Sequence, residues 1–264
     1  MNLRTHIRFL FTLSALTVCA LQTPAEALWP VGQHTASVGP QIYQLKRVRE
    51  GGTHQKGIMY GVRGVCERTE PNSLYWGVEG NWAKGTLEGT TGTGRALKSN
   101  MTESIAEGRL GWTFEGQLWT YFSFTPFAGI GYYEGENRFV PPTALTIRFT
   151  DTFAYFTAGF QSAFWVNDLF SVGLNIRAQD MYEGNDRISD DPDNPAFSTR
   201  IEDERHWVIE TPLNCYPTFC GRCVEISLTP FYQYRHFGGR EGIFDFLDTK
   251  FYILGARLTI GTAF

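Results

Sequence analysis

The residues best suited to chemistry in this 264-residue chain include three cysteines within one short segment. Cys215, Cys220 and Cys223 follow one another closely, and Cys66 lies far away in the sequence. Their spacing is close to that of a zinc site, but the segment lacks a nearby histidine and a second CxxC pair. We therefore predict that all four are disulfide cysteines, with one bridge inside the segment and the others to Cys66 or to another chain. A zinc site is the alternative.

A second chemical candidate is the acidic stretch at 185–204, which holds seven carboxylates. It lacks the regular oxygen-ligand spacing of a calcium loop, so we predict a solvated external loop instead. The carboxylates in and after this stretch could also pair with a histidine in a hydrolytic site. A serine–histidine pair elsewhere in the chain is a second hydrolytic candidate. None of these sets joins a nucleophile, a base and an orienting group at a usable spacing, so we predict neither an enzyme nor a cofactor. The residues weighed are Asp203, His206, Asp245, Asp248, His34, Ser37 and His236.

Nine charged residues share one feature: each lies on the polar face of a segment whose other face is apolar. Such a period of two predicts β-strands with two different faces. Burying nine charges in a small soluble core would be costly, whereas a polar lumen accommodates them. We predict that they point into the lumen of a barrel. They are Arg63, Glu79, Glu107, Arg109, Arg177, Glu210, Glu225, Arg235 and Arg257.

Ten two-faced segments run along the chain, from a weak one at 35–48 to a strong one at 250–264. Short turns and longer breaks alternate between them, and the longer breaks include 89–100 and 185–204. This asymmetry is typical of a transmembrane β-barrel, whose turns are short on one side and whose loops are long on the other. We predict a closed, antiparallel, up-and-down barrel of about ten strands, with eight or twelve as alternatives.

The first 27 residues predict a cleaved secretory signal peptide. Arg4 and Arg8 precede an apolar core, and Ala25-Glu26-Ala27 forms a small-x-small cleavage site. A single domain would then span 28–264. Mean hydropathy is slightly negative at -0.22, which excludes a bundle of membrane helices but suits a barrel, in which only alternate residues face lipid. The net charge of -4 and the lack of a basic aromatic patch give no indication of nucleic-acid binding.

The closing strand, which ends on an aromatic residue, resembles that of bacterial outer-membrane β-barrels, as does the T-P-F-x-G-x-G-Y pattern at Thr125–Tyr132. The resemblance implies an integral outer-membrane protein with periplasmic termini and extracellular long loops. It also implies partners: membrane lipid, the barrel-assembly machinery and disulfide-linked envelope proteins. The residues that would form the assembly signal are Phe264, Ile260, Leu258 and Tyr252.

Function follows from the expected size of the lumen. About eight strands leave room only for side chains, and sixteen to eighteen open an aqueous channel. Charges of both signs inside ten strands should form ion pairs that fill the lumen. We therefore predict a structural or surface-interaction role through long external loops. A narrow passive channel is the first alternative. An outer-membrane hydrolase or protease is the second alternative. Omptin-type proteases also have ten strands, and they resemble this chain in that architecture only.

Overall fold

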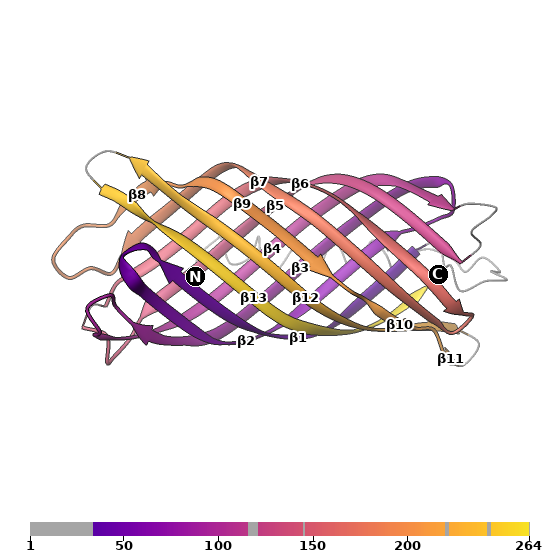
Figure 1. Ribbon diagram of the computed structural model, residues 1–264, viewed down its shortest axis with the longest axis horizontal. Helices are drawn as coiled ribbons and strands as arrows, with labels where there is room; N and C mark the ends of the chain where they lie inside the picture. Colours follow the sequence, from indigo (N-terminus) through magenta and orange to yellow (C-terminus); the bar gives the residue numbers. More distant parts are fainter. Residues whose placement is uncertain (1–33, 116–120, 145, 220–221, 242–243, 264) are drawn as a thin grey trace, which may run out of the picture.

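The computed structural model describes residues 34–115, 121–144, 146–219, 222–241 and 244–263, apart from some side chains near the gaps. This part of the chain is almost entirely β-structure (Figure 1), and none of its helices is long and apolar enough to cross a membrane. The long elements are β1 His34–Arg49, β2 Thr53–Arg68, β3 Ser73–Thr90, β4 Ala96–Glu115, β5 Phe122–Phe139, β6 Arg148–Asn167, β7 Phe170–Ser189, β12 Arg222–Glu241 and β13 Phe244–Ala263. The short ones are the 3-10 turn η1 Glu50–Gly52, β8 Phe197–Arg200, β9 Glu202–Glu210, β10 Leu213–Cys215 and β11 Thr218–Phe219.

The strands close into a ten-stranded antiparallel barrel, as predicted. The closing strand β13 pairs with β12 on one side and with β1 on the other, where Thr35 lies opposite Ala263. The weakly patterned first segment is therefore a full wall strand. Strands β9 and β10 together fill one wall position between β7 and β12, and β8 and β11 are additional short strands. Closure satisfies the backbone of every wall strand and leaves no sheet edge.

The two ends of the barrel differ in their connections. At the end that holds His34 and Ala263, which we call proximal, residues 69–72 join β2 to β3 and residues 168–169 join β6 to β7. At the opposite, distal end the connections are η1, 91–95, 140–147 and 190–196.

Much of what the sequence indicated as distal loop is strand. The break at 89–100 shrinks to 91–95 between β3 and β4, and the acidic stretch contains the end of β7, all of β8 and the start of β9. The prediction of a solvated loop is wrong for Asp186, whose side chain is fully buried inside the barrel. Pairing with β6 and β8 continues the sheet through this polar stretch and keeps the alternation of faces.

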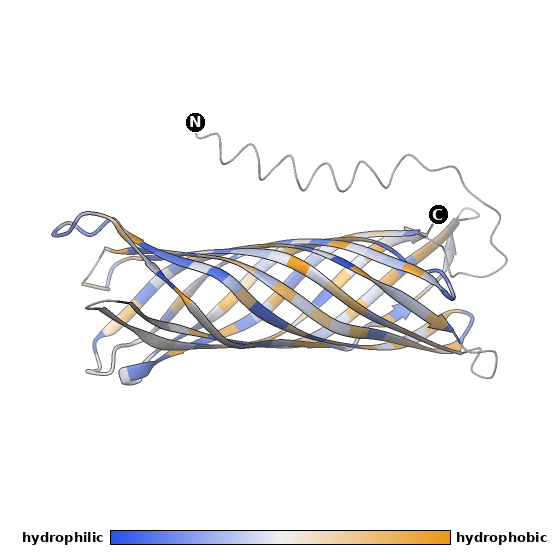
Figure 2. Cartoon of the chain, turned by 90° about the horizontal axis from the view of Figure 1, so that it is seen from above, coloured by the Kyte–Doolittle hydropathy of each residue, from blue (hydrophilic) through white to orange (hydrophobic). Residues whose placement is uncertain are grey.

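The two halves of the wall have opposite polarity. In the proximal half the outward side chains are apolar and the inward ones are charged, as lipid outside and a polar lumen require. In the distal half the outward residues are polar, and the inward ones combine an apolar cluster with buried polar residues such as Gln55, Ser99 and Asn137. Hydrophilic and hydrophobic residues alternate along the strands (Figure 2). Outward apolar residues of the proximal half include Trp112, Phe114, Leu228, Leu258 and Ile260. Outward polar residues of the distal half include Lys46, Lys56, Lys84, Glu88, Asn100 and Arg187.

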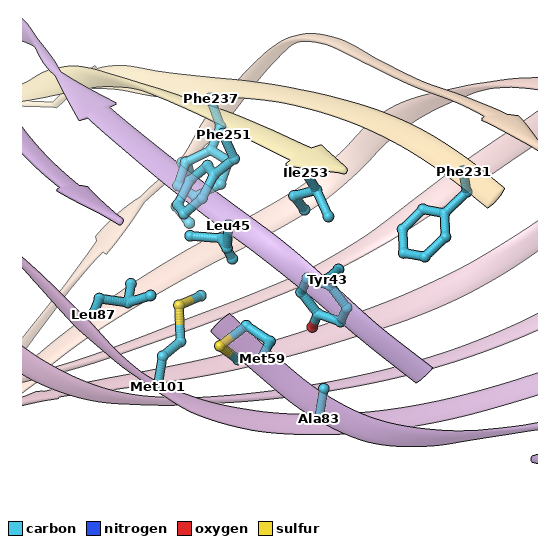
Figure 3. Packing of buried hydrophobic residues seen from close by; sticks show 11 residues of the cluster. Tyr43, Leu45, Met59, Ala83, Leu87, Met101, Phe231, Phe237, Phe251 and Ile253 are labelled. Atoms are coloured by element: carbon cyan, nitrogen blue, oxygen red, sulfur yellow. The ribbon is translucent and has the colours of Figure 1, made fainter. Parts of the chain in front are cut away.

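The apolar interior of the distal half is a packed core (Figure 3). Leu45, Met59 and Leu87 are completely buried there, and Phe251 stacks on Phe237 with ring centroids 5.2 Å apart. Sequence reasoning assigned only polar residues to the inner face and missed this core. A barrel wall that leaves the bilayer must bury apolar surface inward, because its outer face meets water.

Candidate functional site in the barrel lumen

Seven of the nine predicted lumen charges form one ion-pair network across the barrel, which we call the charge layer. Its members come from β2, β3, β4, β7, β9 and β13, so side chains far apart in sequence meet inside the closed wall. All seven are buried, with relative exposures of 9% or less. They are Arg63, Glu79, Glu107, Arg109, Arg177, Glu210 and Arg257.

Glu79 is the centre of the charge layer. Arg63 donates to it from two nitrogens, with Nε 2.9 Å from Oε1 and Nη2 2.8 Å from Oε2. Arg177 Nη1 lies 3.2 Å from Oε2, and Arg109 Nη2 donates to the same oxygen. One carboxylate thus accepts hydrogen bonds from three guanidinium groups. Forked pairs of this kind fix geometry as well as charge.

The other two carboxylates extend the layer across the lumen. Glu107 accepts from Arg109 Nε at 2.6 Å and from Arg177 Nη1 at 3.1 Å. Glu210 accepts from Arg257, and its carboxylate lies 3.5 Å from Arg177 Nη2. The contacts of Glu107 with Arg177 and of Glu210 with Arg257 bridge the lumen between strands that are not neighbours in the wall.

A second cluster of hydrogen-bonded side chains lies beside the charge layer, with Glu103 at its centre. The hydroxyls of Tyr43 and Tyr133 both donate to it at 2.7 Å, and Arg235 Nη1 lies 2.6 Å away. Sequence reasoning identified Arg235 but not Glu103, although Glu103 shares the inward parity of Glu107. The ninth predicted charge, Glu225, is partly buried on β12.

A carboxyl pair lies farther toward the distal end. Asp151 and Asp186 are opposite each other on β6 and β7, and both are buried. The outward apolar residues of the proximal half form what we call the apolar belt. The outward residues next to the carboxyl pair are Thr150 and Arg187, so this level of the wall lies beyond that belt. Burial, and then the charge of Asp151, raise the pKa of Asp186 to about 8. Asp186 therefore keeps its proton at neutral pH.

This pair predicts that the barrel loses stability as pH rises. The folded pKa of Asp186 is about 8 against an ordinary value of 3.8, so between these values the folded state binds a proton that the unfolded state releases. The free energy of unfolding should therefore fall with rising pH across this window and level off above it. The slope for one full proton is about 1.4 kcal/mol per pH unit. Unfolding in detergent micelles, followed by tryptophan fluorescence from pH 5 to 9, measures it.

The control is Asp186→Asn, which keeps the size and polarity of the side chain but cannot ionise. This variant should flatten the pH profile between 5 and 9. Arg47 and Arg49 on β1 lower the pKa of both carboxyls, and Glu103 on β4 raises the pKa of Asp151. A wild-type profile as flat as that of the variant would contradict the raised pKa of Asp186.

The cysteines lie mostly at the proximal end. Cys215 and Cys223 are free thiols in the structure, so neither forms part of a bridge here. Cys66 is buried near the proximal end of β2. Cys220 lies outside the described residues, and the disulfide connectivity stays a prediction. Within the described part of the chain, no group of three or more His, Cys, Asp or Glu residues could hold a metal ion.

The assembly-signal residues on β13 face outward. Tyr252, Leu258 and Ile260 are all exposed on the outer wall, and Arg257 between them points inward. Phe264 lies outside the described residues. The recognition of this strand by an assembly machinery stays a prediction.

Of the hydrolytic sets considered from the sequence, only the histidines and Ser37 have described side chains. His206 lies inside the barrel, where its ring packs against Phe153 at 5.5 Å and Phe237 at 6.3 Å between centroids. His236 is buried on β12, whereas His34 and Ser37 are near the proximal end of β1. The side chains of Asp203, Asp245 and Asp248 lie outside the described residues.

Solved structures with similar folds are bacterial outer-membrane β-barrel proteins, so the chain has that class of fold. The outer-membrane protease OmpT from Escherichia coli matches with a TM-score of 0.61 and 10% identity, over 92% of this chain and 100% of that one. The translocator domain of the autotransporter NalP from Neisseria meningitidis matches with a TM-score of 0.48 and 7% identity, over 99% and 96%. No family model and no curated protein matches the sequence.

Proposed function

We propose that this chain is an outer-membrane barrel with a structural or surface-interaction role, whose lumen is closed and whose distal half projects from the cell surface. The charge layer is the observation that carries the proposal. A buried network of three carboxylates and four guanidinium groups spans the barrel where a channel would need water. Each group is held by partners on other strands, and removing one partner of a buried pair costs several kcal/mol.

The change in polarity of the outer wall between the proximal and distal halves supports the surface role. A barrel that only crosses a bilayer needs an apolar outer belt and little else. Here the strands continue beyond that belt with a polar outer face and an apolar core, so the distal half is a rigid platform in water. With periplasmic termini, this platform and its connections would face the exterior. Exposed loops on a rigid scaffold are where binding residues usually lie.

Permeability separates this proposal from a narrow passive channel. Liposomes that contain the refolded barrel should swell in a small-sugar solution no faster than empty liposomes. Swelling that scales with the amount of inserted barrel would favour the channel. Resistance of the inserted barrel to added protease establishes that it spans the liposome membrane.

A further inference from the structure

Three lysines meet on the outer wall where the apolar belt ends and the polar distal half begins. Lys46 on β1 is directly opposite Lys56 on β2. Lys250 on β13 is the diagonal neighbour of Lys46, because Lys250 pairs with Val48. Lys46 and Lys56 are exposed and Lys250 is partly exposed, so the wall carries three adjacent positive charges. We call Lys46, Lys56 and Lys250 the lysine triad.

The lysine triad has no acidic partner among the described residues. Glu88 is opposite Lys56, but its carboxylate lies 2.8 Å from the ammonium group of Lys98. Like charges directly opposite each other on neighbouring strands destabilise a sheet. An anion between Lys46 and Lys56 would remove this repulsion.

Aromatic residues lie beside and below the triad. Tyr252 is opposite Lys46 on the other side, and the Lys46 ammonium lies 6.0 Å from the centre of its ring. Tyr234 packs against Tyr252 with centroids 5.4 Å apart. Farther round the wall, the Lys84 ammonium lies 5.8 Å from the centre of the Trp82 ring. Tyrosines and tryptophans gather at the level of lipid head groups, so the triad stands at that level.

At the level of the triad the outward charges differ between the two sides of the barrel, although Arg138 and Arg187 are exposed nearer the distal end of β5 and β7. At the corresponding boundary on β5 and β7, the outward residues are Glu134, Asp180 and Glu183. An anionic group in the membrane would be attracted to the β13–β1–β2 side and repelled from the β5–β7 side. A general requirement for solubility would not separate the two signs in this way.

We propose that the lysine triad binds the phosphate-bearing head group of an anionic lipid in the adjoining membrane leaflet. The phosphate would lie between the Lys46 and Lys56 ammonium groups, with Lys250 as a third donor. The acyl chains would lie along outward apolar residues just below, Ile58 and Leu254 among them. This proposal rests on the membrane insertion stated under Proposed function but not on a closed lumen.

Native mass spectrometry of the folded barrel tests the proposal. The barrel is taken from mixed micelles that contain either phosphatidylglycerol or phosphatidylcholine. The wild type should retain phosphatidylglycerol in preference to phosphatidylcholine. The triple variant Lys46→Gln, Lys56→Gln, Lys250→Gln should retain it about a hundred-fold more weakly, since each lysine near a membrane surface contributes about 1 kcal/mol.

The matched control removes three positive charges elsewhere in the distal half, through Arg95→Gln, Arg138→Gln and Arg187→Gln. It should retain phosphatidylglycerol as the wild type does. Equal retention by the triad variant and the control would overturn the proposal, as would equal retention of the two lipids by the wild type. Excess inorganic phosphate should compete only weakly, and full displacement would show a site for free phosphate rather than for lipid. Failure to insert into liposomes would instead contradict the proposed function.

Discussion

Replacing Glu79 with alanine is expected to lower the free energy of unfolding by about 3–5 kcal/mol. Glu79 is buried, and Arg63, Arg109 and Arg177 all donate to its carboxylate. Without it, three guanidinium groups remain inside the barrel with less compensating charge and with unsatisfied N–H donors. Urea unfolding in detergent micelles, followed by tryptophan fluorescence, gives the difference.

The matched control is Glu88→Ala on the same strand. Glu88 faces water and forms an exposed ion pair with Lys98, so its loss should leave the unfolding midpoint unchanged within error. A Glu79 variant as stable as this control would mean that the charge layer is not held by its central carboxylate.

Replacing Phe251 with alanine is expected to cost about 3–5 kcal/mol, as large-to-small changes of buried phenylalanines do. Its side chain is 1% exposed, its ring stacks on Phe237, and the Arg47 guanidinium lies 5.6 Å from its centre. The substitution would leave a cavity in the apolar core of the distal half. If packing in the distal half stabilises the barrel, the free energy of unfolding should fall even though Phe251 lies beyond the apolar belt.

Phe197→Ala provides the comparison for this prediction. Phe197 lies on the short strand β8 with its side chain exposed, so its removal should cost less than about 1 kcal/mol. Both variants are measured by the same urea unfolding. Equal effects of the two substitutions would show that the distal interior contributes no packed core.

The barrel itself follows from the sequence because a period of two is a local signal. The alternation around Arg257 on β13 and around Arg63 on β2 is enough to place both side chains inside, where the structure has them. The same parity rule correctly directs Leu258 and Ile260 to the outer wall. The antiparallel closure between β13 and β1 follows from an even number of strands.

The contacts inside the lumen do not follow from local pattern. Glu103 receives Tyr43 and Tyr133 from different strands, and only the stagger of a closed wall determines that they meet. The distal half was missed for a related reason. Beyond the apolar belt the inside and outside exchange their polarity, so a rule that assigns charges to the lumen fails for Lys46 and Lys56. The pairing of Asp151 with Asp186 depends on both the stagger of the closed wall and the change in polarity beyond the apolar belt, so the local pattern does not predict it.

Single-channel recording in planar bilayers tests the central claim, a lumen closed by the charge layer, most directly. With protein whose insertion is verified by protease resistance, the account predicts no current steps above the bare bilayer at any applied voltage that the bilayer tolerates. A stable, reproducible open conductance from the wild-type barrel would contradict it.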